Sequence, residues 1–290
     1  MQQAADGQRV WFVTGGGRGI GRELVEAALE AGECVAATVR NPTALEELVA
    51  THPDRVEVAV VDVREREAVR RAVDAAVHRF GRLDVVVNNA GYGLVGAIEE
   101  VTEQEVRAIV DTNTFGAIWV TQAALPHLRQ QGGGHVVQIS TIGGVGAMTL
   151  FGLYNASKWA LEGFSEALAG EVARFGVRVT IAELSGFATD WAGTSMQFAS
   201  PNPDYDGVRT DLFGVAEVPW PLPEGDVDPT DAPPAVAAGA IRAHVDAPDG
   251  PLRLLVGDDA PTYVAAAIAR RRDDYERDDR FDWPAPLGGA

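Results

Sequence analysis

The sequence is poor in cysteine, in lysine and in long apolar runs. Its 290 residues include one cysteine, Cys34, so no disulfide can form within the chain and nothing requires an oxidising compartment. No apolar run approaches the roughly 20 residues that cross a bilayer. The first nine residues are polar and lack the apolar region of a secretory signal. These absences predict a cytoplasmic protein without a membrane span.

Positive charge is also scarce. The chain has 24 Lys and Arg residues against 42 Asp and Glu residues, for a net charge of −18. Because such a surface repels phosphates overall, nucleic acid is not an expected partner. Lys158 is the only lysine among those basic residues. A compact, titratable ammonium is not interchangeable with a guanidinium, so Lys158 is a candidate functional residue.

Apolar runs alternate with helical patterns through most of the chain. Strands are predicted at residues 9–14, 34–39, 56–61, 83–87, 135–140, 177–182 and 252–256. Helices are predicted at residues 19–31, 68–80, 102–130, 153–175, 235–245 and 261–272. This alternation predicts an α/β fold, a Rossmann-like doubly wound parallel sheet of about seven strands with helices on both faces.

The organisation predicted is a single Rossmann-like domain over residues 1–290. Residues 186–234 are rich in proline and poor in helix formers, which is typical of a functional loop, and we expect them to form a substrate loop or lid. Residues 235–290 are expected to add a C-terminal helix, strand, helix and tail. Ligands of such sheets bind beyond the carboxyl ends of the strands, so the residues that follow each strand are the candidates for function.

A glycine-rich turn follows the first strand, with the sequence Thr14-Gly-Gly-Gly-Arg-Gly-Ile-Gly21. Glycines at a strand-to-helix turn let the backbone approach a pyrophosphate, which the helix N-terminus then stabilises. The alternative is a bare turn without a ligand. Its position at the first strand–helix junction favours nucleotide binding.

Further motifs follow in a fixed order. Asp62-Val63 ends the third strand, Asn88-Asn89-Ala90-Gly91 ends the fourth, Asn113 lies in the long helix, Ser140 ends the fifth strand, and Tyr154 precedes Lys158 by four residues. Together with the TGxxxGxG turn, this set resembles the short-chain dehydrogenase/reductase family over about Val10 to Thr189. The resemblance implies catalytic roles for Asn113, Ser140, Tyr154 and Lys158. It implies cofactor contacts for Gly15, Arg18, Gly19, Ile20, Gly21, Asp62, Val63, Asn89, Ala90, Gly91, Tyr154, Lys158, Gly186 and Thr189.

The chemistry of the residues agrees with this resemblance. Tyr154 and Lys158 are four residues apart, so they share one face of a helix. A nearby ammonium favours the phenolate, and we therefore expect it to lower the tyrosine pKa toward neutrality. The resemblance implies that Tyr154 is the general acid for reduction, that Lys158 also binds the nicotinamide ribose, that Ser140 holds the substrate oxygen, and that Asn113 positions a relay water.

The end of the second strand bears on the choice of nicotinamide. An acidic residue there would bind the ribose 2′-hydroxyl of NAD, but the strand runs into Arg40 and Asn41. Arg40 and Arg18 could neutralise a 2′-phosphate, so we expect NADP(H) to be preferred over NAD(H); the alternative is that both arginines are merely exposed. Ser185 stands where the family commonly has proline, which predicts a less rigid loop before Gly186 and Thr189.

The substrate segments implied by the resemblance are rich in apolar and aromatic residues. Candidate lining residues are Tyr92, Met148, Phe151, Phe187 and Trp191. They predict a hydrophobic ketone, aldehyde or alcohol as substrate, although several could instead lie in the core or at a subunit interface. Two other functions stay open: altered chemistry on the same fold, such as epimerisation, dehydration or reductive cyclisation, and a non-catalytic cofactor sensor. The family commonly forms dimers or tetramers, so a homo-oligomer is expected. The spacing of the histidines predicts no metal site.

Overall fold

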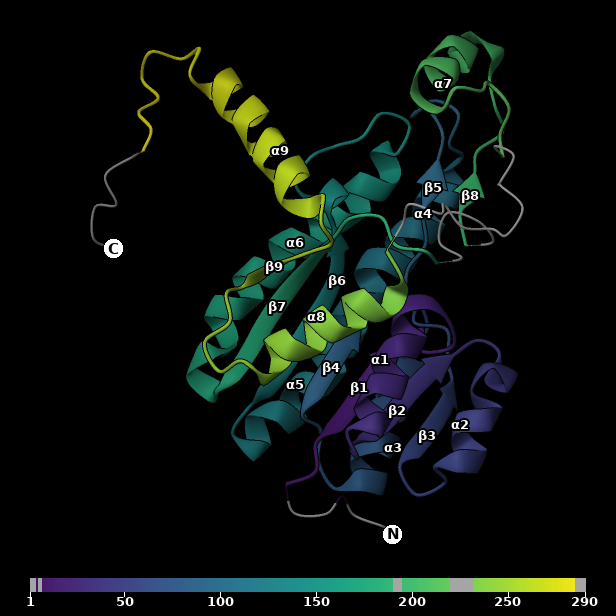
Figure 1. The fold of residues 1–290 in the computed structure, drawn as a ribbon, viewed down its shortest axis with the longest axis vertical. Helices are drawn as coiled ribbons and strands as arrows, with labels where there is room; N and C mark the ends of the chain where they lie inside the picture. The colour runs from purple at the N-terminus through teal and green to yellow at the C-terminus, as the bar shows by residue number, and fades with distance from the viewer. Residues whose placement is uncertain (1–3, 5–6, 190–194, 220–231, 285–290) are drawn as a thin grey trace.

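The protein is built around one large parallel sheet. The structure is a computed structural model that describes residues 4, 7–189, 195–219 and 232–284. The strands of the large sheet are β1 (Val10–Thr14), β2 (Cys34–Val39), β3 (Val56–Val60), β4 (Val85–Asn88), β6 (Gly134–Thr141), β7 (Val177–Leu184) and β9 (Arg253–Val256). They lie in the order β3-β2-β1-β4-β6-β7-β9, all parallel (Figure 1).

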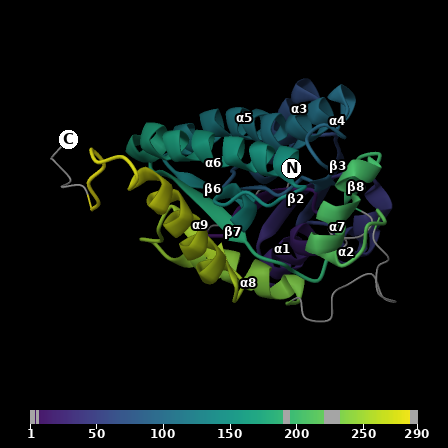
Figure 2. The ribbon, with the colours of Figure 1, turned by 90° about the horizontal axis from the view of Figure 1, so that it is seen from above.

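Two layers of helices cover the sheet (Figure 2). One layer contains α1 (Gly19–Glu30), α2 (Glu46–Thr51) and α8 (Pro234–Asp246), and the other contains α3 (Arg66–Phe80), α5 (Gly116–Gln131) and α6 (Gly152–Val172). The strand order reverses between β1 and β4, and ligands of such sheets bind in the crevice at the carboxyl ends of the strands at that point. This arrangement confirms the predicted Rossmann-like fold and its seven strands.

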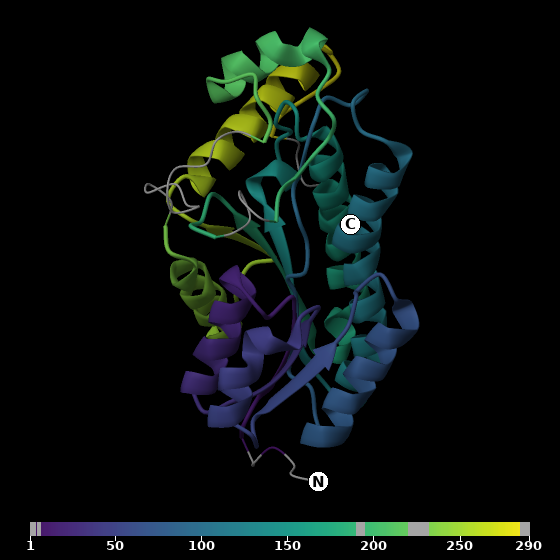
Figure 3. The same cartoon turned by 90° about the vertical axis from the view of Figure 1, so that its right-hand side faces the viewer.

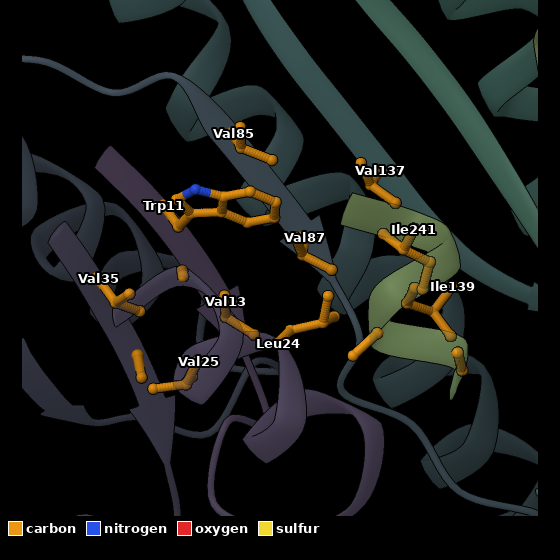
Figure 4. Packing of buried hydrophobic residues seen from close by; sticks show 14 of the residues in the cluster. Trp11, Val13, Leu24, Val25, Val35, Val85, Val87, Val137, Ile139 and Ile241 are labelled. Carbon is orange, nitrogen blue, oxygen red and sulfur yellow. The ribbon is translucent and has the colours of Figure 1, made fainter. Parts of the chain in front are cut away.

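Both faces of the central strands are buried, as their continuous apolar sequences require. In β1, Trp11 and Val13 face α1 and α8, whereas Val10 and Phe12 face the layer of α3, α5 and α6. Figure 4 shows Trp11 and Val13 packed with residues of α1, β4, β6 and α8. Trp11 is 1% exposed, and its indole Nε1 donates to a carboxylate oxygen of Glu33 at 2.8 Å, so its one polar atom is satisfied inside the core.

The structure corrects the predicted helix over residues 102–130. The chain forms α4 (Glu103–Val110), then a π-helical turn over Asp111–Phe115, and then α5. Thr102 and Glu105 form a capping box that starts α4. The π-turn shifts the helical register by one residue, which changes the apolar spacing too little to be recognised in the sequence. Such π-turns often occur at functional sites.

The segment after β7 also contains structure that the composition did not predict. Strand β8 (Gln197–Phe198) pairs in parallel with β5 (Leu94–Val95), and α7 (Asp206–Phe213) follows. Figure 3 shows α7 beyond the carboxyl ends of the large sheet, on the same side as α9 (Ala260–Tyr275). Part of the predicted lid, residues 190–194 and 220–231, lies outside the described residues.

A buried ion pair attaches α7 to the rest of the protein. The Arg209 guanidinium is 2% exposed and donates to Glu100 at 2.7 Å, to Asp206 at 2.8 Å and to the Asn202 carbonyl at 2.7 Å. Glu100 also accepts from the backbone N–H groups of Ala97 and Asn202. A buried charge with this many partners fixes the position of α7, because any displacement would leave the guanidinium unpaired.

The packing of α8 gives a stability prediction. Ile241 is 1% exposed and packs against β1, β4 and β6, whereas Val236 on the same helix is 53% exposed. Ile241→Ala should lower the free energy of unfolding by about 2–5 kcal/mol, because it removes apolar contacts and leaves a cavity. Val236→Ala should change it by less than about 0.5 kcal/mol. Denaturant titration of both variants checks this, and equal losses would show that α8 is not part of the core.

Candidate active site

The turn between β1 and α1 requires glycine, because its backbone conformation and close packing leave no room for larger side chains at these positions. Gly15 has φ +66° and Gly19 has φ +53°, a left-handed backbone that favours glycine. A Cβ on Gly21 would lie 2.4 Å from both the Gly15 carbonyl oxygen and the Asn89 side-chain nitrogen. Helix α1 begins directly after this turn, at Gly19. Backbone N–H groups at a helix N-terminus favour a bound phosphate, so the turn fits a dinucleotide.

Hydrogen bonds join the asparagine loop after β4 to this turn. The Asn89 side chain donates to the carbonyl oxygens of Thr14 at 2.9 Å and Gly15 at 3.2 Å. The Thr14 hydroxyl accepts from the backbone N–H groups of Asn89 at 2.9 Å and Ala90 at 3.0 Å. The two loops that border the crevice therefore form one rigid unit, with their backbones close enough to line a shared groove.

The ends of β2 and β3 lie near each other at the adenosine side of the crevice. Arg40 is exposed, and its charge acts on Asp62. Asp62 accepts from Arg64 at 2.5 to 3.0 Å, and that hydrogen bond is the main reason that its pKa lies below the usual value. Val63 is buried against Gly116 at the start of α5. Thr189 packs on Gly19, which places the loop after β7 beside the glycine turn.

Tyr154 and Lys158 lie together on the buried face of α6, as their spacing predicts. They are 4% and 6% exposed. The Lys158 ammonium donates to the Ile139 carbonyl of β6 at 2.7 Å. Its burial lowers the pKa of Lys158 to about 8, although the negative charge of Glu162 opposes this. A Cβ on Gly91 would lie 3.6 Å from Lys158 Nζ and 3.0 Å from Asn113 Oδ1, so the asparagine loop ends beside the ammonium.

The structure corrects the expected pKa of Tyr154. Burial disfavours the phenolate and raises the pKa of Tyr154, and a side-chain hydrogen bond with Thr141 opposes this shift. Desolvation is the larger of these two influences, and the Lys158 ammonium donates to the Ile139 carbonyl. The expected lowering of the Tyr154 pKa is therefore wrong for this structure.

Asn113 lies in the π-helical turn, and its side chain joins three elements. Its Oδ1 accepts from the backbone N–H of Tyr92 at 3.1 Å, and its Nδ2 donates to the Tyr92 carbonyl at 3.0 Å and to Ser157 Oγ at 3.1 Å. These bonds attach the asparagine loop to α6.

Ser140 has a partner that sequence reasoning missed. Its hydroxyl lies 2.5 Å from Glu162 Oε1, and both side chains are buried. Glu162 lies one helical turn beyond Lys158 and two turns beyond Tyr154. This spacing on α6 could have identified Glu162 from the sequence as a residue on the same helix face. Ser185, which replaces the family's usual proline, donates its backbone N–H to the Val256 carbonyl at 3.0 Å, a bond that proline cannot make.

The expected substrate residues fall into separate places. Tyr92, Met148 and Phe151 belong to one apolar cluster with Tyr154, beyond the carboxyl ends of the strands. The structure does not bring Phe187 to this cluster, because it packs near Gly257 in the core on the α8 side. Trp191 lies outside the described residues. Other members of the apolar cluster are Leu94, Val95, Ala97, Ile109, Leu150, Met196, Phe198, Tyr205 and Phe213.

Phe213 was missed because its helix lies in a segment whose composition predicts a loop. Its ring packs edge-on against Phe151, with the centroids 6.3 Å apart. Phe151 in turn packs against the Tyr154 ring at 6.4 Å. A continuous aromatic wall therefore leads from α7 to the phenol that would transfer the proton.

Comparison with known proteins identifies the family. Residues 9–199 match the family described as short chain dehydrogenase. This chain belongs to the short-chain dehydrogenase family. It is 40% identical over 261 residues, 89% of this chain and 92% of the relative, to an oxidoreductase, BOA17, of Botryotinia fuckeliana. It is 36% identical to a 3-ketodihydrosphingosine reductase of Bacteroides thetaiotaomicron, covering 68% of this chain and 71% of that one.

A solved structure supports the same assignment. A short-chain dehydrogenase from Streptomyces avermitilis superposes with a TM-score of 0.83 at 38% identity, over 93% of this chain and 96% of that chain. The protein is thus an NAD(P)-dependent oxidoreductase of this family. Among the helices that the structure describes, none has the length and apolar character to cross a bilayer.

The burial of the one lysine gives a direct prediction. Carbon-13 labelled lysine should produce a single set of side-chain NMR signals, because the chain has only Lys158. Its Cε shift should titrate with a pKa near 8 rather than at the ordinary value of 10.5, since burial disfavours the ammonium. In Glu162→Gln the midpoint should fall further, because a stabilising negative charge is lost. A midpoint near 10.5 would show that the ammonium is solvated.

Proposed function

We propose that the protein is an NADP(H)-dependent oxidoreductase that interconverts a hydrophobic ketone or aldehyde with its alcohol. The observation that carries the proposal is the place of Tyr154, a buried phenol that is part of an apolar cluster and lies one helical turn from the buried Lys158. A phenol in that position can protonate an oxygen whose carbon skeleton occupies the apolar side. Such a cluster suits a ligand whose surface is mostly apolar.

Each polar residue then has a task in reduction. The nicotinamide cofactor, when bound, supplies the hydride to the carbonyl carbon. Tyr154 donates its proton to the carbonyl oxygen, and its raised pKa keeps that proton in place until charge develops on the oxygen. Lys158 stabilises the phenolate left behind and binds the ribose, Ser140 binds the substrate oxygen, and Asn113 holds the asparagine loop next to them. The reverse sequence oxidises an alcohol.

The character of the substrate follows from the side chains near Tyr154. The wall of Phe213, Phe151 and Tyr154 is aromatic, and Met148 and Tyr92 contribute further half-buried apolar surface. The Bacteroides relative is named for the reduction of a 3-keto compound. Both observations favour a ketone with a large apolar body over a small polar one.

The first experiment measures turnover. NADPH and NADH oxidation is followed with 1-tetralone, 2-decanone, benzaldehyde and decanal, and with cyclohexanone as a small ketone. Turnover should be fastest with the larger ketones and should fall about 100- to 10,000-fold in Tyr154→Phe, the contribution of general acid catalysis. NADPH should still bind to the variant.

The outcomes separate this proposal from its two alternatives. Tight NADPH binding without turnover of any compound, in wild type as in Tyr154→Phe, would favour a cofactor sensor. Consumption of an activated substrate without net NADPH oxidation would favour altered chemistry, such as epimerisation. Either result would contradict the proposal that the protein is a ketone reductase.

The preference for NADP(H) rests on the charges at the end of β2. Arg40 follows a strand that ends without a carboxylate, and Asp62 at the end of β3 is engaged by Arg64. Arg40→Ala should raise KM for NADPH about tenfold or more, the value of one charge-assisted hydrogen bond. KM for NADH should change little. Arg70→Ala on the outer side of α3, where Arg70 pairs with Glu67 and Asp74, is the control. Equal effects on the two cofactors would contradict the preference.

The expected assembly and location belong to the same proposal. Phe115 and Trp159, beside α5 and on α6, are 41% and 43% exposed, which supports a homodimer or homotetramer formed through these helices. The charge balance and the single cysteine support a cytoplasmic protein.

A further inference from the structure

The Ser140 hydroxyl is hydrogen-bonded to the buried carboxyl group of Glu162. Glu162 Oε1 lies 2.5 Å from Ser140 Oγ, within hydrogen-bond distance. The residues are 3% and 6% exposed. A Cβ on Gly144 would lie 2.7 Å from Ser140 Oγ and 2.9 Å from Glu162 Oε1, so the backbone of Gly144 packs directly on the pair. This contact closes the pair off from water on that side.

Charged groups on three elements, α6, β7 and β9, surround Glu162. Lys158 and Glu166 lie on the same helix, α6, and both act on the Glu162 charge. Arg253 of β9 lies 3.3 Å from Glu162 and 3.0 Å from Glu166. The same guanidinium lies 3.1 Å from Glu183 of β7, which is the register partner of Ser140 on β6. Lys158 is already bonded to Ile139, so Arg253 is the cation in contact with the carboxylates.

The balance of charge in this cluster favours a bound proton. Glu162 and Glu183 are both buried and share one guanidinium that is 39% exposed and also pairs with Glu166. Burial and mutual repulsion both disfavour the state with two carboxylates ionised. Burial raises the pKa of Glu162, and it raises the pKa of Glu183 to about 7. The two buried carboxyls and their one shared guanidinium therefore favour a state in which the cluster holds a proton.

The position of that proton fixes what Ser140 can offer a ligand. A serine hydroxyl has one proton to donate. If Glu162 is ionised, it accepts that proton's hydrogen bond, and Ser140 presents only lone pairs to the site. If Glu162 is protonated, it can donate to Ser140 Oγ, and the serine proton is then available for another acceptor. A ketone oxygen needs a donor, whereas an alcohol can donate to an acceptor.

We propose that Glu162 is a positioning residue whose protonation state decides whether Ser140 binds the ketone or the alcohol. Protonated Glu162 turns the Ser140 hydroxyl toward a carbonyl oxygen and favours reduction. Ionised Glu162 holds the hydroxyl and favours binding of the alcohol, which donates to Ser140. The inference rests on the proposed function and adds to it a control of direction.

The proton on Glu162 is not consumed in the reaction. Reduction adds a hydride from the nicotinamide to the carbonyl carbon and a proton from Tyr154 to the oxygen, which balances the conversion of ketone to alcohol. Glu162 keeps its proton throughout that step. It changes only the relative affinities of the two ligands, so its effect appears in binding.

The first test needs no substrate. The infrared C=O stretch of a protonated carboxyl is followed against pH, and the band of Glu162 is found by difference from Glu162→Gln. Glu183→Gln separates the contribution of the second buried carboxyl. The band should disappear as pH rises, at a midpoint above the ordinary glutamate value, because burial raises the pKa of Glu162. It should shift in Ser140→Ala, which removes its partner, and should persist in Glu166→Gln. Glu166 contacts the same guanidinium but is 64% exposed, which makes it the matched control.

Each outcome of that titration decides the proposal. A Glu162 carboxyl that is ionised, or protonated, at every pH at which the protein is folded would overturn it. A titrating band that is indifferent to Ser140→Ala would also overturn it. This measurement is independent of turnover, so the absence of ketone reductase activity would leave its result standing.

The second test measures ligand affinity in Tyr154→Phe, which removes the phenol and its titration. 1-Tetralone is titrated in the presence of NADP⁺, and 1-tetralol in the presence of NADPH, so that neither pair can react. As pH rises through the Glu162 titration, the affinity for the ketone should fall and that for the alcohol should rise, each by about tenfold, the value of one hydrogen bond.

In Tyr154→Phe/Glu162→Gln the opposite pH trends of the two affinities should be lost, since the amide can donate or accept but does not titrate. In Tyr154→Phe/Glu166→Gln the opposite trends should remain. Parallel trends of ketone and alcohol, or opposite trends that survive Glu162→Gln, would overturn the proposal. A double variant that fails to fold would be recognised by circular dichroism, and the infrared titration of the single variants would then decide.

Discussion

The burial of a single ammonium, Lys158, constrains the rest of the site. Lys158 is buried at the junction of α6 and β6, and its hydrogen bond to the Ile139 carbonyl offsets part of the free-energy cost of removing the ammonium from water. Glu162 lies one helical turn away on α6, and its negative charge favours the ammonium whenever that carboxyl is ionised. Glu162 is itself buried and lies 3.3 Å from the guanidinium of Arg253. The polar network behind the catalytic face is therefore connected to the one titratable cation placed inside the protein.

The parallel sheet determines where these groups can meet. Strands β6 and β7 end at the same edge, so Ser140 and Glu183 become register partners, and β9 brings Arg253 to the same side. Helix α6 crosses this edge and contributes Tyr154, Lys158 and Glu162 at intervals of four residues. Helical spacing and strand register therefore bring these side chains into one small region. Tyr154, Lys158 and Glu162 are all held by a single helix, α6, which fixes their relative positions.

Sequence reasoning found the parts of this site that have local signals. The glycine turn, the asparagine loop and the Tyr154–Lys158 pair are recognisable from spacing alone, and the structure brings them together. Sequence reasoning did not find the Ser140–Glu162 contact, because that contact depends on how α6 packs on β6. The π-turn at Asn113 and helix α7 were missed for a similar reason: a shift of helical register or a helix with few buried residues leaves apolar periodicity unchanged.

The pKa of Tyr154 shows how burial can reverse an inference from charge alone. Proximity to Lys158 in the sequence predicts a lowered pKa, but the ammonium faces a carbonyl and the phenol faces an apolar cluster, so desolvation dominates. Burial acts in the same way on Glu162, raising its pKa, and in the opposite sense on Lys158. Burial therefore brings the proton affinities of Glu162 and Lys158 closer together, whereas it moves those of Tyr154 and Lys158 apart.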